Sequence, residues 1–378
     1  MSGPTVLLTL GRLPKALALA RACKAAGCRV LVADPFRWHL CRPSRDVAAC
    51  FRVSAPNDPQ GSYHDDLLRI IEEERVDIVL PVSEEALHVV RGADRLPREV
   101  RLWTGAREEI ARYHDKLDFV RHVQSLGLDA PTSEPGGSAA AGMLAAQADY
   151  VIKPRHSCSG IGLRLARAGE PMGELNSESL VQARVEGEHL SSLSLVHEGR
   201  AIATVVYCGR VFAGTVAICF ERVENASVED WVQRFLATSS YSGFLAFDFI
   251  VDSDGRAQAI ECNPRATSGV HFFEPASLGR ALIDPAGTSS IEWSPHRRQQ
   301  WAYSTLTETY AALFRPKEFK RRFGELWSAR DVVWSGHDPL PFLLMTPMSW
   351  EILWPAMTTK LTLGEATQRD IAWFGGNA

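Results

Sequence analysis

Short apolar runs and amphipathic segments alternate along the first hundred residues. Residues 6–10 form an apolar run, residues 14–26 are rich in alanine and leucine, and residues 29–33 form a second apolar run. The middle segment has a proline near its start and Gly27 after its end, as helices often do. The order strand–helix–strand with tight connections is typical of a parallel sheet. We therefore predict an α/β domain over residues 1–105.

The rest of the chain follows a different pattern. Residues 191–220 alternate apolar and small side chains, which predicts a run of antiparallel strands. Further elements are predicted as helices over residues 114–126 and 228–236, a strand over 150–154, a strand and turn over 180–187, and a hairpin over 247–265 with Ser-Asp-Gly as its turn. The Gly-, Ser- and Ala-rich residues 134–146 are predicted to be a surface connection.

Composition narrows the class of protein. The 378 residues are 46% hydrophobic and 23% charged, which is ordinary for a globular protein and unlike a disordered one. The net charge of −4 gives no electrostatic reason to expect a nucleic-acid or membrane partner. No apolar stretch reaches the roughly 18 residues of a membrane-spanning helix, and the N-terminus lacks the pattern of a signal peptide.

Cysteine usage and the first strand turn exclude two further classes. The eight cysteines form no C-x-x-C pair, so they are interpreted as reduced thiols, and a cytoplasmic location is expected. The turn after the first strand reads Gly11-Arg-Leu-Pro14 instead of G-x-G-x-x-G. A dinucleotide pyrophosphate needs the close backbone approach that those glycines allow. We therefore do not expect NAD to bind this domain.

The predicted hairpin near the middle of the chain carries the strongest chemical signal. Its turn folds Asp248 back beside Glu261, and Asn263 lies on the same strand face as Glu261 because side chains alternate with period two. Two carboxylates and an amide oxygen suit Mg²⁺. Arg265 would place a guanidinium at the rim, where it suits a phosphoryl or carboxylate oxygen. The alternative is an ordinary solvated acidic strand.

A second signal is a lysine at the end of a strand. Lys153 precedes a loop of small residues that includes Ser157, Ser159 and Gly160. Such a loop can bring backbone N–H groups against phosphates without side-chain clashes. Plain turns have the same composition, so this signal is weak alone. Cys158 lies in the loop, but no His–Asp constellation around it favours a nucleophile over a small filler.

The order of these parts resembles the ATP-grasp superfamily. The parts are Lys116, Lys153 with its loop, the strand and turn at 180–187, and the hairpin with Asp248, Glu261, Asn263 and the N-P-R sequence. The resemblance covers roughly residues 1–290. It implies an α/β fold with α+β character in the nucleotide-binding part, divided into an entry domain (1–105), a small lid subdomain (106–179), a large subdomain with the metal site (180–295) and a C-terminal extension (296–378).

The resemblance also implies roles for individual residues. ATP phosphates would contact Lys116, Lys153 and the loop with Ser157, Ser159 and Gly160, and the adenine slot would be lined by Gln182, Ala183 and Val185. Mg²⁺ would be held by Asp248, Glu261 and Asn263, and Arg265 would stabilise the phosphoryl group in transfer. Many members bind ribose with a glutamate two residues after the glycine of the 180–187 turn. This chain has Glu188 and His189 there, and either is a candidate.

Four segments look closer to one group within the superfamily, the enzymes of mycosporine-glycine synthase type. The segments are residues 53–63, 222–233, 260–265 and 331–342. This chain departs from them by reading Thr-Ser-Gly-Val-His after the N-P-R sequence. Ser268, Gly269 and His271 would border the substrate, so the acceptor can differ. His271 is a candidate general base for an amine, although a structural role is the common alternative.

These roles imply an ATP-dependent ligase that forms a C–N bond. It would phosphorylate a carboxylate or a vinylogous acid (an enol) and couple it to an amine such as that of an amino acid, releasing ADP and phosphate. A kinase that stops at the phosphorylated product and a non-catalytic nucleotide-binding subunit are the alternatives. No nucleic-acid or membrane partner is expected, and a homodimer is an open possibility for its assembly.

Three other features have simpler explanations. Glu84 and Glu85 follow a strand and start a helix, so helix capping explains them better than a substrate role. Asp338, between a histidine and a proline, is best explained as a turn residue. The tryptophans after residue 296 are expected in the core more than around the substrate.

Overall fold

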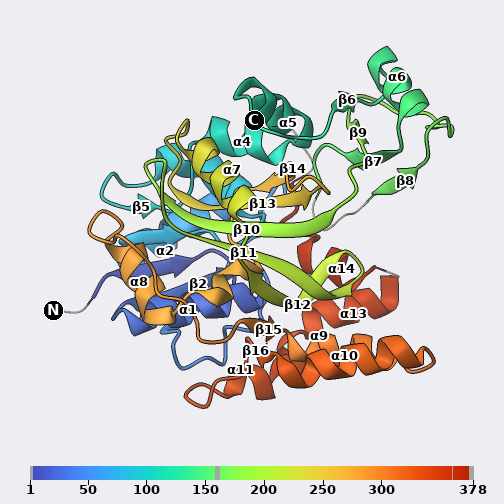
Figure 1. Cartoon of the computed structure of the whole chain (residues 1–378). Coiled ribbons are helices and arrows are strands. Elements are labelled where there is room, and N and C mark those ends of the chain that lie inside the picture. Colours follow the sequence, from blue (N-terminus) through green and yellow to red (C-terminus); the bar gives the residue numbers. More distant parts are fainter. Residues whose placement is uncertain (1–2, 158–161, 360, 374–378) are drawn as a thin grey trace.

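The entry domain forms a parallel sheet, as the sequence predicts. The computed structural model describes residues 3–157, 162–359 and 361–373 (Figure 1). All pairings in this five-stranded sheet are parallel, in the order β3-β2-β1-β4-β5. The strands are β1 (Thr5–Leu8), β2 (Arg29–Asp34), β3 (Ala49–Arg52), β4 (Ile78–Leu80) and β5 (Arg101–Leu102), and the helices are α1 (Pro14–Ala25), α2 (Tyr63–Glu74), α3 (Ala86–Val89) and the 3₁₀ helix η1 (Val90–Arg95).

Helix α1 joins the entry domain to the rest of the molecule. It packs against α8 (Pro275–Ile283), a helix that follows the predicted metal hairpin. A Cβ atom at Gly279 would lie 2.1 Å from the carbonyl oxygen of Ala22, so only glycine permits this close approach. The close approach of these two helices places the carboxyl end of the parallel sheet beside the segment after the N-P-R sequence.

A small antiparallel sheet follows, in the order β6-β9-β7-β8. Its strands are β6 (Ser133–Pro135), β7 (Tyr150–Pro154), β8 (Arg164–Ala166) and β9 (Ser179–Ala183), and α6 (Ala139–Gln147) packs against them. The helices α4 (Arg107–His114) and α5 (Lys116–Ser125) precede this sheet and pack mainly against the large sheet that follows. The expectation of an unstructured connection over residues 134–146 is wrong. Ser138 caps α6 by accepting the N–H of Ala141, and the alanines that follow favour helix.

The third sheet is large and mostly antiparallel, as predicted for residues 191–220. It runs β14-β13-β10-β11-β12-β15-β16. Its strands are β10 (Glu188–His197), β11 (Arg200–Ala213), β12 (Val216–Val223), β13 (Gly243–Val251), β14 (Ala257–Asn263), β15 (Arg298–Gln300) and β16 (Arg330–Asp331). Helix α7 (Ala226–Leu236) packs Trp231 edge-to-face against Phe247 and Phe249 of β13, and Phe235 edge-to-face against Phe247. This aromatic cluster fixes the back of the strand that carries Asp248.

The C-terminal segment completes the large sheet and then becomes helical. Its helices are α9 (Ala302–Ala311), α10 (Pro316–Ser328), α11 (Leu340–Leu343), α12 (Met345–Met348), α13 (Trp350–Thr359) and α14 (Leu363–Gln368). Figure 1 shows α9, α10 and α13 together at one end of the molecule, away from the small sheet. Trp327, Trp334, Trp350 and Trp354 are 78%, 38%, 50% and 54% exposed, so the expectation of core positions is wrong for these four.

Buried ion pairs attach the C-terminal segment to the entry domain. Asp338 is buried and accepts hydrogen bonds from the guanidinium of Arg21 and the hydroxyl of Ser44. Arg12 contacts both Asp34 and Asp370 at 2.6 Å. Asp338 therefore holds two parts of the chain together. No helix among the described residues has the length and apolar character needed to cross a membrane.

Candidate active site

The two carboxylates of the predicted metal site lie side by side. Asp248 on β13 is directly opposite Glu261 on β14, and the register shifts between Asp248 and Phe249, so Ile260 has no partner on β13. Such a bulge re-aims the neighbouring side chains. Asn263 donates its amide to Asp248 Oδ2 at 3.0 Å, and the Ser191 hydroxyl donates to Oδ1. The hairpin therefore brings all three predicted ligands together.

Two lysines from outside the hairpin, one on α5 and one on β7, meet this strand. Lys116 begins α5, and its Nζ lies 3.8 Å from Glu261 Oε2 and donates to the carbonyl of Ser157. Lys153 lies on β7, and its Nζ donates to the carbonyl of Ile260 at 3.1 Å. Both lysines are buried, with 5% and 6% of their surface exposed. The bulge thus supplies the carbonyl group that Lys153 contacts.

The charges in this site shift one another's pKa values. Burial, reinforced by the charge of Glu261, raises the pKa of Asp248 to about 7. Burial works against ionisation of Glu261 too, but the ammonium groups of Lys116 and Lys153 lower its pKa overall. Burial lowers the pKa of Lys153 to about 8, although Glu261 opposes this shift. Ionisation of one carboxylate therefore disfavours ionisation of the other. A cation bound between them would relieve this repulsion.

The donor set fits Mg²⁺ better than a transition metal. It consists of two carboxylates with an amide beside them, all hard oxygen donors. No cluster of three or more His, Cys, Asp or Glu suited to a metal ion occurs in the described part of the chain. A cation here would complete its shell with water or phosphate oxygens, as Mg²⁺ commonly does. The oxygen of Asn263 currently accepts from Arg265, so Asp248 and Glu261 are the primary candidates.

Glu84 is a site residue that sequence reasoning missed. Arg265 Nε donates to Glu84 Oε1 at 2.6 Å, and Glu84 is 1% exposed. The neighbouring Glu85 stands at the N-cap of α3 but makes no side-chain capping hydrogen bond, and its carboxylate accepts the backbone N–H groups of Val82 and Ser83, which precede the helix. The capping hydrogen bond expected from the sequence is therefore absent at Glu85. The position of Glu84 in the sequence could have indicated it, because it follows β4 at the carboxyl end of a parallel sheet, where ligand sites commonly lie.

The residues predicted to hold the nucleotide base and ribose lie along the link between the small and large sheets. Gln182 is buried and donates its amide to the Ser133 hydroxyl, and the N–H of Ala183 donates to the carbonyl of Thr132. Val185 is half-buried, and Glu188 and His189 are exposed at the start of β10. Their roles remain predictions. Ser157 is bonded to Lys116, whereas Ser159 and Gly160 lie outside the described residues.

The predicted substrate residues follow Arg265 on the 3₁₀ helix η2 (Ser268–Phe272). Ser268 is half-buried. A Cβ atom at Gly269 would lie 2.7 Å from that of Leu193, so this glycine serves packing against β10. The His271 ring stacks on Phe220 with 5.8 Å between centroids, and burial lowers its pKa to about 3. A histidine held neutral in this way is a weak base for an amine.

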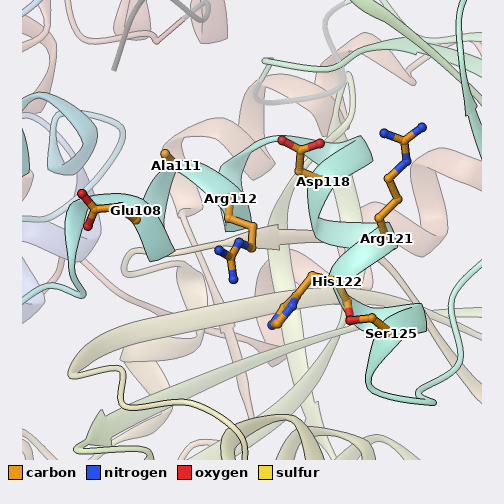
Figure 2. Close-up of a pocket in the computed structure, with 7 residues that line it drawn as sticks. All are labelled: Glu108, Ala111, Arg112, Asp118, Arg121, His122 and Ser125. Atoms are coloured by element: carbon orange, nitrogen blue, oxygen red, sulfur yellow. The ribbon is translucent and has the colours of Figure 1, made fainter.

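A shallow pocket lies on α4 and α5, and Figure 2 shows Arg112 and His122 pointing to the same side of these helices. Its lining is Glu108, Ala111, Arg112, Asp118, Arg121, His122 and Ser125. It includes none of the predicted site residues. We place the active site where the lysines and carboxylates converge, because opposed buried charges are what a phosphate and metal site requires.

Comparison with known proteins agrees with this placement. The model of the ATP-grasp domain family matches residues 113–269, the range that holds both lysines, both carboxylates and Arg265. Over these residues the chain is similar to an ATP-grasp domain. The fold is the ATP-grasp fold, with a parallel five-stranded sheet before it. N5-carboxyaminoimidazole synthetase from Staphylococcus aureus superposes with a TM-score of 0.61 at 14% identity, covering 77% of this chain and 80% of that one. L-amino acid ligase from Bacillus licheniformis gives 0.57 at 14% identity, with 75% of each chain covered.

Curated relatives of this chain come from Methanosarcina. The 3-methyl-D-ornithine–L-lysine ligase of M. acetivorans is 29% identical over 204 residues, which is 53% of this chain and 50% of the relative. The corresponding ligase of M. mazei is 27% identical over 206 residues, 53% of this chain and 48% of that one. The chain thus spans about half the length of the curated relatives it matches. These relatives give no support to the closer resemblance to mycosporine-glycine synthases.

Proposed function

We propose that the protein is an ATP-dependent ligase that activates an acid by phosphorylation and joins it to the amine of an amino acid. One observation carries this proposal. Lys116 on α5 and Lys153 on β7 converge on the Asp248–Glu261 pair of the β13–β14 hairpin. Buried ammonium groups facing buried carboxylates form a site for a triphosphate with its cation. Similar proteins are ligases that act on amino acids, and this supports an amino acid as the source of the amine.

The chain's own residues would act mainly by positioning and charge. The two lysines would hold phosphate oxygens and offset the charge that develops during transfer. Mg²⁺, held by Asp248 and Glu261 with Asn263 beside them, would neutralise phosphate charge when bound. Arg265 donates to Asn263 and Glu84, so its guanidinium lies at the edge of the same site. It is the candidate for the transferred phosphoryl group.

The reaction would proceed in two steps. An oxygen of the acid attacks the γ-phosphorus of ATP, the bond to the β-phosphate oxygen breaks, and ADP leaves. The amine nitrogen then attacks the activated carbon, phosphate leaves, and the nitrogen loses a proton to solvent. The acid is a carboxylate or a vinylogous acid. With a carboxylate the product is an amide, and with a vinylogous acid it is an enaminone.

Phosphate release tests this function. The purified protein is incubated with ATP and Mg²⁺ and with pairs drawn from carboxylic acids, cyclic 1,3-diketones and amino acids, and products are identified by mass spectrometry. We expect phosphate release that requires both an acid and an amine. Transfer of phosphate to the acid without an amine would identify a kinase instead. ATP binding without turnover of any pair would favour a non-catalytic subunit.

Nucleotide binding gives a test that does not depend on the substrate. Lys153→Ala removes a buried charge from the phosphate site, so we expect the affinity for ATP with Mg²⁺ to fall at least about 10-fold, measured by calorimetry. Lys317→Ala, at an exposed position on α10, is the matched control and should bind like the wild type. Equal affinity of the two variants would contradict the phosphate role of Lys153.

A further inference from the structure

Asp115 is a buried carboxylate that contacts the chain beside both phosphate lysines and has no role in the proposed reaction. It directly precedes Lys116, and it accepts hydrogen bonds from Nε and a terminal nitrogen of Arg155 at 3.0 and 2.6 Å. Nε2 of His156 lies 3.2 Å from the same carboxylate. Only 4% of the surface of Asp115 is exposed. Arg155 and His156 follow closely after Lys153 in the sequence, so Asp115 holds the segment that carries the second lysine.

The same carboxylate caps helix α5. Its Oδ1 accepts the backbone N–H groups of Leu117 and Asp118 at 2.9 and 3.1 Å. Helix α5 is itself fixed to β13 of the metal hairpin, because Phe119 stacks on Phe247 with 5.9 Å between ring centroids. Asp115 therefore connects a helix that is anchored on the large sheet to the end of a strand of the small sheet.

We propose that Asp115 is a positioning residue for ATP, and that its ion pair with Arg155 holds Lys116 and Lys153 at the spacing that one chain of phosphates requires. The inference rests on the proposed ligase function and adds a residue to its nucleotide site. Asp115 would not touch the nucleotide. It would set the relative placement of two ammonium groups that come from different elements.

The charges of the two lysines give this connection a physical purpose. Burial lowers the pKa of Lys153 to about 8, and the nearby charge of Lys116 acts in the same direction. Two cations on separate elements repel each other and move apart unless the surrounding structure holds them. A bidentate pair of carboxylate and guanidinium supplies fixed geometry as well as energy. The N–H of Lys116 also donates to the carbonyl of Arg155 at 3.3 Å, so a backbone hydrogen bond joins the same two segments.

The ion pair stays charged at neutral pH. Burial opposes ionisation of Asp115, but the hydrogen bonds from His156 and Arg155 hold its pKa well below the usual range. The hydrogen bond to Asp115 in turn raises the pKa of Arg155. Asp115 therefore acts as a fixed charge with a geometric task and not as a proton donor.

A comparison of ATP with adenosine tests this role. Asp115→Asn keeps a side chain that caps helices about as well as aspartate does, but it lacks the charge that holds Arg155. We expect the affinity for ATP with Mg²⁺ to fall about 10-fold, measured by calorimetry, as for the loss of one charge-assisted hydrogen bond. The affinity for adenosine, which carries no phosphate, is measured by NMR titration and should stay at the wild-type value.

Neighbouring residues supply the control and a second variant. Asp118 also lies 3.3 Å from Arg155, but its side chain is 48% exposed, so Asp118→Asn should bind ATP like the wild type. Arg155→Gln removes the buried pair from the other side, and it serves if Asp115→Asn does not fold. We expect the same loss in Arg155→Gln, and little further loss in the double variant, because all three proteins lack one and the same interaction.

The outcomes separate this inference from the function on which it rests. Wild-type affinity for ATP in both Asp115→Asn and Arg155→Gln would overturn the positioning role and leave the nucleotide site in place. An equal loss for ATP and adenosine would make Asp115 a purely structural residue and would also overturn it. A larger loss in Arg155→Gln that adds to that of Asp115→Asn would assign Arg155 a direct phosphate contact instead. A wild-type protein that binds neither nucleotide would overturn the ligase function itself, and this inference with it.

Discussion

Two hairpins of this protein bury charged side chains, and they do so in opposite ways. In the β13–β14 hairpin, Asp248 and Glu261 are like charges placed directly opposite each other, and their cationic neighbours come from other elements. In the α9–α10 helical hairpin, the buried charges are Arg322 and Glu325. Each of these has partners of opposite charge, which are Glu308 and Glu318 for the arginine and Arg210 and Arg298 for the glutamate.

The difference separates a binding site from a structural network. Opposite charges that satisfy one another inside a fold need no ligand. Two adjacent carboxylates facing two lysines leave like charges unresolved on each side, and a cation with a polyphosphate between them would resolve both. Burial of charge alone therefore does not indicate function here. The arrangement of signs does.

The largest expected effect lies in the β-hairpin. Glu261→Gln removes one of the paired carboxylates, so we expect turnover to fall at least about 100-fold, as loss of a metal ligand should cost more than loss of an outer-shell contact. The protein should still fold with a modestly lower melting temperature, because Lys116 and Lys153 lose a nearby carboxylate and the relief of repulsion with Asp248 offsets only part of that loss. Activity is measured by phosphate release and folding by thermal denaturation. Wild-type turnover in this variant would contradict the metal assignment.

In the α9–α10 hairpin, loss of a buried charge should reduce stability and leave turnover unchanged. Arg322→Met removes a buried guanidinium that donates to Glu308 and Glu318. Glu308 then loses this cation, whereas Glu318 retains its ion pair with Arg315. We expect a loss of about 1.5–3 kcal/mol in the free energy of unfolding, measured with urea, because charged hydrogen bonds are lost. Turnover per folded molecule should match the wild type. A variant that unfolds normally but turns over slowly would break the comparison.

The sequence predicted the β-hairpin well because its information is local. Period-two alternation and a three-residue turn suffice to place Asp248 opposite Glu261. The partner of Arg265 could not be predicted in this way, since Glu84 is 181 residues away along the chain and comes from another sheet. Its neighbour Glu85 is also a glutamate, but it has different hydrogen-bond partners. Only the register of β4 and the turn after it decides which carboxylate faces Arg265.

Composition misled in two other places. The segment 134–146 is rich in small residues, and its alanines form α6, which buries Ala141 and Ala145 against the small sheet. In helices α9 and α10, some polar side chains are buried and some large aromatic side chains are exposed, which is the reverse of the usual pattern. These helices bury Thr305, Thr309 and Arg322 and expose Tyr310 and Trp327, so tryptophan content did not indicate a core. Hydrophobic periodicity identifies the stripe of a helix but not the side on which the rest of the molecule lies.

The smallest expected effect concerns a third way of burying a titratable group, which is to keep it neutral. His88 on α3 is 6% exposed and packs against Trp373, with 5.1 Å between ring centroids. Burial lowers its pKa to about 4, although the backbone of residues 371 and 372 opposes this. The folded pKa lies below the unfolded value of about 6.5, so the unfolded chain takes up the proton first as the pH falls.

The contribution of His88 to stability is therefore complete above about pH 6.5 and is lost progressively between there and pH 4. From pH 7 to 5.5 we expect it to reduce the free energy of unfolding by roughly 1 kcal/mol. His88→Gln removes the titrating group, so its urea midpoint should depend less on pH over this range than that of the wild type. His114 and His271, which are also held neutral by burial, will keep part of the dependence in both proteins. Parallel pH curves for the variant and the wild type would show that His88 takes up its proton as readily in the folded protein as in the unfolded chain.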